Sequence, residues 1–76
     1  MNIKSELNSI FFNVLKVSKT KNRNEVTSKK IKKWDSINHV RLILVIESKF
    51  GLKIDPDESI ELMSYNEIYK YIKNKD

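Results

Sequence analysis

The chain contains no cysteine, one glycine and one proline. Without cysteine it forms neither disulfides nor zinc–thiolate sites, and a cytoplasmic location is permitted. So few glycines and prolines disfavour an all-β fold, which needs many tight turns. No apolar run approaches the roughly 18 residues of a membrane span, and residues 1–4 lack the apolar region of a signal peptide. These absences predict a helical, cytoplasmic protein.

What is present fits one small domain. The chain has 76 residues, of which 39% are hydrophobic and 33% charged, a globular rather than a disordered composition. A chain of this length buries only about 60% of the surface that its unfolded form exposes. We therefore expect a single domain spanning 1–76, monomeric, with one thin core and no deep enzyme pocket.

The net charge of +5 is unevenly distributed. Residues 16–33 carry eight bases and one acid, for a net charge of +7, whereas the remainder carries seven bases and nine acids, for −2. A solvated, mobile loop is one interpretation of this basic segment, and an electrostatic contact for an acidic partner is another. A small basic helical nucleic-acid-binding module is a more distant alternative, because no recognition helix bearing arginine and aromatic residues follows the segment.

Hydrophobic periodicity predicts a first helix over residues 3–17 and a long loop over 18–33. The loop is polar, with Val26 and Ile31 as candidate anchors. The apolar residues that recur at helical spacing in the first helix are Ile3, Leu7, Ile10, Phe11, Val14 and Leu15.

A second helix is expected over residues 36–50. Its β-branched run 40–46 is typical of a buried strand, but fifteen residues without glycine or proline favour a helix. Asp35 or Ser36 suits the N-cap, and Gly51 suits the left-handed position after the end. A helix that is apolar nearly all round is a central one. We expect its inward residues to be Ile37, Val40, Leu44 and Phe50, widened by Ile43 and Ile46.

Two further helix starts follow. Asp55, Pro56 and Glu58 form a compact start with capping-box spacing, which predicts a short third helix. The segment 64–67 repeats this spacing and opens a last helix. The residues expected to face inward are Ile60 and Leu62 in the third region, and Ile68, Tyr71 and Ile72 in the last helix. The fold class is therefore all-α.

The segment from Trp34 to Ile72 resembles the acyl carrier protein family. Asp35-Ser36-Ile37 is similar to the family's Asp-Ser-Leu signature and stands at the start of the second helix. The downstream landmarks are residues 47–51, Ile54, the acidic segment 55–61 and the closing Tyr71-Ile72. This resemblance implies a four-helix acyl-carrier-like bundle: three main helices, one short helix, and a long loop between helices one and two.

The resemblance also implies a function. A phosphopantetheinyl transferase would move 4′-phosphopantetheine from coenzyme A to Ser36, and Asp35 would cap the helix and present the serine. The arm's thiol would carry an acyl group as a thioester, which fits the absence of cysteine. The inner surface of helices two to four would shelter a lipophilic cargo. The implied partners are that transferase, an acyl- or aminoacyl-loading ligase and a downstream transferase. An aminoacyl or peptidyl cargo is the alternative.

This region has two other interpretations. Asp35 and Ser36 also fit plain helix capping, which is compatible with attachment. A hydrolase would need a base that reaches the serine, but His39 lies only three residues further along the helix, and no glycine-rich elbow accompanies it. We therefore expect no catalytic residue and no metal ligand.

The flanks of the signature depart from the commonest fatty-acid carriers. Lys32, Lys33 and Trp34 replace a Leu-Gly pair and a small residue. Trp34 is expected to fold over the core. A Trp before Asp-Ser and a His three residues after the serine, here Trp34 and His39, resemble a specialised branch of the family that serves surface-polysaccharide, flagellin-modification or secondary-metabolite pathways. The family's second helix is usually acidic, whereas here the candidate partner contacts are Asn38, His39, Arg41 and Glu47. Since charge complementarity selects partners, this pattern predicts dedicated ones. His39 is expected on the surface, as a contact beside the arm or as a passive residue.

Overall fold

The computed structural model describes residues 2–75, and within them the chain is all-α. The elements are α1 (Ile3–Leu15), the 3₁₀ turn η1 (Arg23–Glu25), α2 (Ser36–Phe50), α3 (Pro56–Ser59) and α4 (Tyr65–Lys75). The predicted three main helices and one short helix are confirmed. The first helix ends two residues earlier than predicted, because Lys16 adopts a left-handed φ of 59° and closes it.

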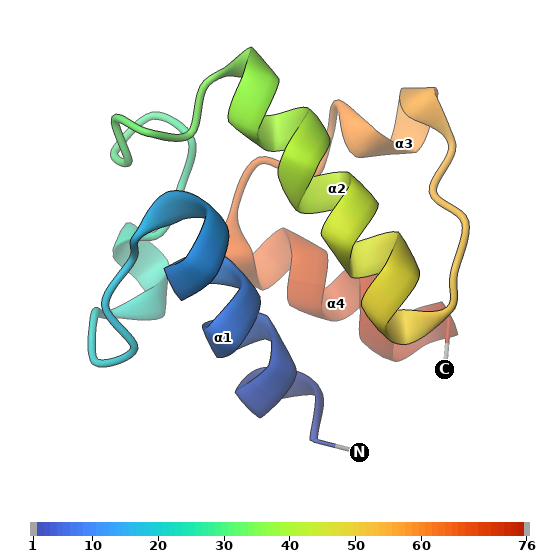
Figure 1. Ribbon diagram of the computed structural model, residues 1–76, viewed down its shortest axis with the longest axis horizontal. Coiled ribbons are helices and arrows are strands. Elements are labelled where there is room, and N and C mark those ends of the chain that lie inside the picture. The colour runs from blue at the N-terminus through green and yellow to red at the C-terminus, as the bar shows by residue number, and fades with distance from the viewer. Residues whose placement is uncertain (1, 76) are drawn as a thin grey trace.

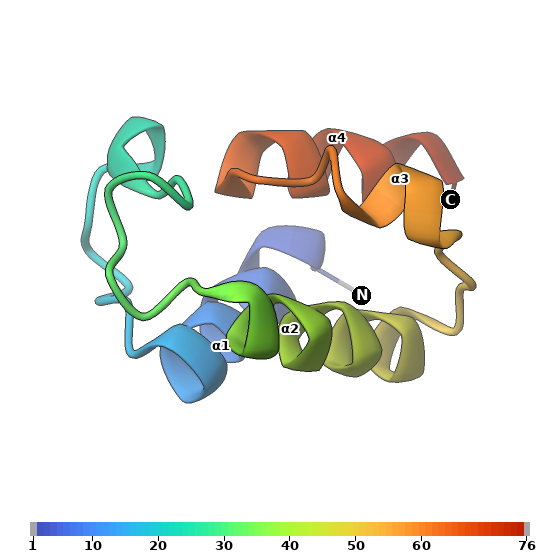
Figure 2. The ribbon, with the colours of Figure 1, turned by 90° about the horizontal axis from the view of Figure 1, so that it is seen from above.

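The helices form two layers. Helices α1 and α2 pack side by side in one, and α3 and α4 lie in the other, as Figures 1 and 2 show. The space between them is filled by buried side chains, so the interior is one thin core, as its size requires. The fully buried members with the largest volumes are Phe11, Leu7, Leu15, Leu42, Ile46, Ile68 and Ile72.

An aromatic cluster joins the two layers. The ring of Phe11 meets Trp34 edge-on at 5.5 Å between centroids and lies 5.1 Å from the ring of Tyr65. These three residues come from α1, from the turn before α2 and from α4, and all are buried. Each such pair contributes about 0.5–1.5 kcal/mol beyond its buried area. Trp34 therefore folds over the core, as predicted.

The inward face of α2 differs from the prediction. Its buried residues are His39, Leu42, Ile43 and Ile46, which follow helical spacing. The prediction that Ile37, Val40 and Leu44 face inward is wrong, because these side chains are 70%, 58% and 58% exposed. The sequence pattern misled because a histidine holds one of the inward positions. The caps are as predicted: Asp35 precedes the helix, and Gly51 follows it with a φ of 63°.

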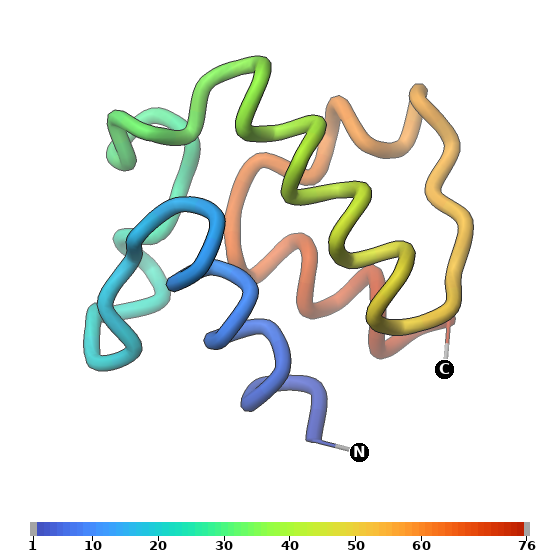
Figure 3. Tube along the Cα trace, in the orientation of Figure 1, coloured from blue at the N-terminus to red at the C-terminus, as the bar shows by residue number. Residues whose placement is uncertain are grey.

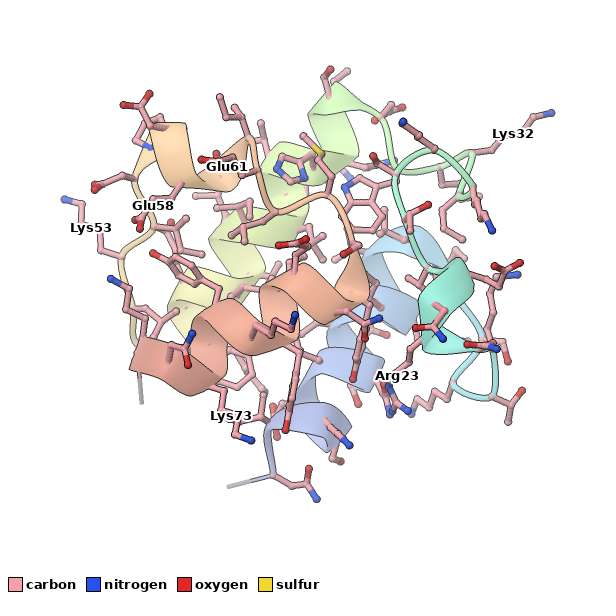
Figure 4. The ribbon with its side chains drawn as sticks, turned by 180° about the vertical axis from the view of Figure 1, so that it is seen from behind. Arg23, Lys32, Lys53, Glu58, Glu61 and Lys73 are labelled. Atoms are coloured by element: carbon pink, nitrogen blue, oxygen red, sulfur yellow. The ribbon has the colours of Figure 1, made fainter. Side chains whose placement is uncertain are left out.

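The basic segment 16–33 is attached to the body rather than running free of it (Figure 3). Val26 is buried, and the backbone around it pairs with the start of α4: Ser28 N–H donates to Met63, and Tyr65 N–H donates to Val26. Arg23 turns inward, as Figure 4 shows, with its guanidinium 4.9 Å from the ring centre of Tyr65. Val26 is thus confirmed as an anchor, whereas the expected anchor Ile31 is half-buried.

Helix α3 has four residues and buries none of them. Asp55 and Pro56 occupy the predicted positions at its start. Of the two residues expected to face inward here, Leu62 is buried, but Ile60 is 64% exposed, which corrects that prediction. A helix this short has little apolar burial to hold it, so polar contacts to its neighbours determine where it lies.

Two side-chain hydrogen bonds connect α3 to other helices. The hydroxyl of Tyr71 in α4 donates to Glu58 Oε1 at 2.8 Å. On the other side, the ring of His39 in α2 is 2.7 Å from the carbonyl oxygen of Ser59. Helix α3 is therefore held at both of its sides by single hydrogen bonds.

The histidine has a defined tautomer in this arrangement. Trp34 Nε1 can only donate, and it lies 2.9 Å from His39 Nδ1, so Nδ1 accepts. The proton is then on Nε2, which donates to Ser59. A continuous line of hydrogen bonds runs from Trp34 through His39 to α3.

We predict that His39→Leu destabilises the fold. The change keeps an apolar volume but leaves the Trp34 indole N–H and the Ser59 carbonyl without partners, which should lower the free energy of unfolding by about 2 kcal/mol. Urea denaturation followed by circular dichroism measures this loss. Asn13→Leu, at an exposed helical position, is the matched control, and equal stability of the two variants would refute the prediction.

The Tyr71–Glu58 bond predicts a loss of stability at high pH. Burial, followed by the hydrogen bond to Glu58, raises the pKa of Tyr71 from 10.0 to about 12. The neutral phenol is thus favoured in the folded state, and this stabilisation is complete below pH 10.0 and lost as the pH rises through about 12. Urea midpoints of the wild type should fall more steeply across this range than those of Tyr71→Phe. If the urea midpoints of the wild type and of Tyr71→Phe fell in parallel with pH, the predicted role of the Tyr71 hydroxyl would be wrong.

Candidate functional site

Ser36 is the first residue of α2, and its side chain is exposed. Asp35 is confirmed as the N-cap: its Oδ1 accepts from the backbone N–H of Asn38 at 2.8 Å. The backbone N–H groups of Ser36 and Ile37 donate to no acceptor within residues 2–75. The serine hydroxyl therefore stands beside two free donors at the positive end of a fifteen-residue helix.

The turn that leads to Ser36 is fixed by several contacts. The side-chain amide of Asn38 donates to the carbonyl of Lys33 at 2.7 Å, and the backbone of Trp34 donates to Ile31 at 3.0 Å. The indole of Trp34 is buried at the same time. Ser36 is thus an exposed side chain on a well-anchored backbone.

A groove of about 540 Å³ lies beside Ser36, between the start of α2 and the α3 region. Three apolar side chains on its wall are strongly exposed for their type: Val40 at 58%, Ile60 at 64% and Met63 at 37%. The full lining is Ser28, Trp34, Asp35, Ser36, His39, Val40, Ser59, Ile60 and Met63. The groove therefore combines exposed apolar side chains with polar ones, Ser36 among them.

His39 is not placed to act as a general base for Ser36. Both ring nitrogens of His39 are engaged, Nδ1 by Trp34 and Nε2 by the carbonyl of Ser59. A histidine placed in this way holds the fold together and has no lone pair available for the serine proton. Within residues 2–75 no group of three histidine, cysteine or acidic side chains gathers to bind a metal ion.

The predicted partner contacts occupy different environments. Arg41 is exposed and Asn38 is partly so, although the amide of Asn38 is bound to the preceding turn. Glu47 is half-buried, and its carboxylate accepts from the backbone N–H of Ile54 at 2.7 Å. The prediction of an exposed His39 is wrong, because the side chain is only 8% exposed and bridges Trp34 to Ser59. His39 therefore shapes the site from inside.

Sequence reasoning missed the groove residues. Val40 and Ile60 were expected in the core, and Met63, Ser28 and Ser59 were not singled out. One signal pointed to them: α2 carries more apolar residues than a single inward face can hold, so some had to line another surface.

Comparison with known proteins gives a relation over the full length of the chain. The chain is 28% identical over 75 residues to an acyl carrier protein of Nitratidesulfovibrio vulgaris strain Miyazaki F, covering 99% of each chain. It is 38% identical over 40 residues to an acyl carrier protein of Campylobacter hominis and 35% identical over 43 residues to one of Rickettsia massiliae. The chain spans about half the length of these last two, 51% and 50%. No family model matches.

The helix order agrees with this relation. With a short third helix and a long connection before the second, it fits the fold that the resemblance implied. Within residues 2–75 no helix is long and apolar enough to cross a bilayer. Over its full length the chain is thus similar to an acyl carrier protein, and at 28% identity this similarity is distant.

Proposed function

We propose that this chain is a cytoplasmic acyl carrier protein whose 4′-phosphopantetheine is attached to Ser36. The observation that carries the proposal is the position of Ser36: an exposed hydroxyl at the start of α2, at the end of an apolar groove. Helix capping alone does not require that groove. Asp35 performs the capping, so the hydroxyl of Ser36 has no structural duty within the described residues.

The residues around Ser36 suit a phosphodiester. The free N–H groups of Ser36 and Ile37 are donors for phosphate oxygens, and the helix dipole favours negative charge at this point. Asp35 is the one carboxylate beside the serine, and its Oδ1 already accepts from the Asn38 backbone, which directs that oxygen toward the helix. A phosphate on Ser36 Oγ is thus compatible with its surroundings.

The attachment itself is a group transfer performed by a phosphopantetheinyl transferase. Ser36 Oγ displaces adenosine 3′,5′-bisphosphate from the phosphate of coenzyme A, and the hydroxyl proton passes to a base of the transferase, since His39 is not free to take it. This chain supplies an anchored backbone and an exposed nucleophile. The attached group supplies the thiol that forms the thioester with the cargo.

The groove suits a cargo with an apolar part. Val40, Ile60 and Met63 line it within reach of the helix start, so an acyl chain leaving the arm meets aliphatic side chains. Burial there removes about 25 cal/mol of unfavourable hydration per Å² of apolar surface. This supports an acyl cargo over a polar aminoacyl one. We therefore propose that the cargo lies in the groove between α2 and α3 rather than on the inner surface of helices two to four.

We further propose dedicated partners in a specialised pathway, served by a loading ligase and a downstream transferase. The exposed side of α2 supports this. Arg41 and Lys49 are its cations, and its one acid, Glu47, is bound to the backbone of Ile54. An enzyme surface selected for an acidic helix would meet a cation here, and like charges in contact disfavour the wrong complex. Of the four candidate partner contacts Asn38, His39, Arg41 and Glu47, we retain Asn38 and Arg41 as proposed contacts.

Attachment is tested by intact mass after incubation with a broad-specificity phosphopantetheinyl transferase and coenzyme A. The wild type should gain one phosphopantetheine group, because its hydroxyl is exposed. Ser36→Ala should gain none, whereas Ser28→Ala, which alters another serine of the same groove, should gain one. A gain in Ser36→Ala, or its absence in the wild type, would exclude Ser36 as the attachment residue.

The claim of dedicated partners predicts poor exchange with a housekeeping carrier. The modified protein should support reconstituted bacterial fatty-acid synthesis at least about tenfold more slowly than that bacterium's own carrier, which corresponds to about 1.4 kcal/mol of lost interaction. Arg41→Glu should recover part of the rate by restoring an acid to α2. Equal rates for the two carriers would contradict a specialised role.

A further inference from the structure

A second groove lies between α1 and α2. Its volume is about 310 Å³, and it is lined by Asn13, Val14, Arg41, Leu44 and Val45. Leu44 is 58% exposed and Val45 is 38% exposed, so neither belongs to the buried core. Aliphatic residues that fold without being buried are available to another molecule.

Arg41 gives this groove an uncompensated positive charge. The guanidinium makes no ion pair within residues 2–75. The nearest acids along the two helices are engaged elsewhere: Glu47 accepts from the backbone of Ile54, and Glu6 lies 3.6 Å from Lys49. The groove therefore combines an aliphatic floor with one free cation at its edge.

We propose that this α1–α2 groove docks a protein partner through a segment that is apolar and acidic. An aliphatic side chain of the partner lies between Val14 and Val45, and an adjacent carboxylate pairs with Arg41. Arginine suits this role because its planar fork binds carboxylates in two-point geometry. The proposal rests on the carrier function proposed above, since a carrier must be held by the enzymes that use its cargo.

Other occupants fit the groove less well. A second copy placed on a two-fold axis through the groove would bring two Arg41 side chains together with no carboxylate between them. An anionic membrane is bound by several cations acting together, whereas Arg41 is the one charged residue in this lining. A single cation beside aliphatic side chains matches one carboxylate in a partner's apolar segment.

The two grooves of α2 are separable. Arg41 follows Ser36 by five residues, which places the two side chains about 140° apart around the helix axis. A partner seated between α1 and α2 therefore leaves Ser36 and its groove open. One enzyme, or one domain, holds the carrier while another acts on the arm.

Photo-crosslinking tests the proposal in cells of the source organism. Benzoylphenylalanine replaces Val45 in this groove or, as the matched control, Val40 in the groove beside Ser36. Mass spectrometry then identifies the peptide joined to each. We expect the residue at position 45 to join a peptide of another protein with an aspartate or glutamate next to an apolar residue. That adduct should fall at least about tenfold in Arg41→Glu and fall less in Arg41→Lys, which keeps the charge but loses the planar fork.

Several results would overturn the docking proposal. They are no adduct at position 45, an adduct with a second copy of this chain or with lipid, a joined peptide without acids, or an unchanged adduct in Arg41→Glu. Intact mass of Ser36 in the same samples separates this test from that of the carrier function. An unmodified Ser36 with the expected adduct removes the carrier function alone, and a modified Ser36 without the adduct removes the docking site alone.

Discussion

The hydrogen bond from the indole of Trp34 to the imidazole of His39 connects the parts on which the site depends. On one side Trp34 packs against Phe11 in the aromatic cluster, so α1 contributes to its position. On the other side His39 donates to Ser59 and places α3. The turn that carries Ser36 lies between Trp34 and His39 in the sequence, and its backbone is therefore held by the core although its side chain is exposed.

This arrangement explains how so small a protein accommodates a long apolar helix although its core is thin. One face of α2 packs in the core, and exposed residues of the same helix line two grooves, one beside Ser36 and one beside α1. The polar residue on the inward face, His39, satisfies both of its ring nitrogens, so its burial costs little. The exposed aliphatic residues are then free to serve binding rather than folding.

Local signals predicted the helices well, because each start carries its own capping chemistry. Asp35, Gly51 and Pro56 act within a few residues of themselves, so a sequence alone places them. The prediction of the inward face of α2 was wrong for the opposite reason. A histidine is inward only because Trp34 and Ser59 are brought to it from different parts of the chain, and spacing within one helix contains no record of that.

Ser36, the proposed attachment residue, stands out in the sequence because its neighbours form a recognisable order along the chain. The groove beside it was not, since Ser28, Val40 and Met63 come from three segments that meet only in the folded state. Segment 16–33 was similar: its charge is plain in the sequence, but its attachment to α4 through Val26 and Tyr65 depends on backbone pairing between distant residues.

Because α3 buries none of its own side chains, this wall of the groove beside Ser36 is held to α2 by one side-chain hydrogen bond and to α4 by another. The 2.7 Å contact between His39 and Ser59 fixes how far α3 stands from α2 on that side. A hydrogen bond is either made or broken over a fraction of an ångström. A molecule that pushes α3 away from α2 would therefore have to release the imidazole of His39 from the carbonyl of Ser59.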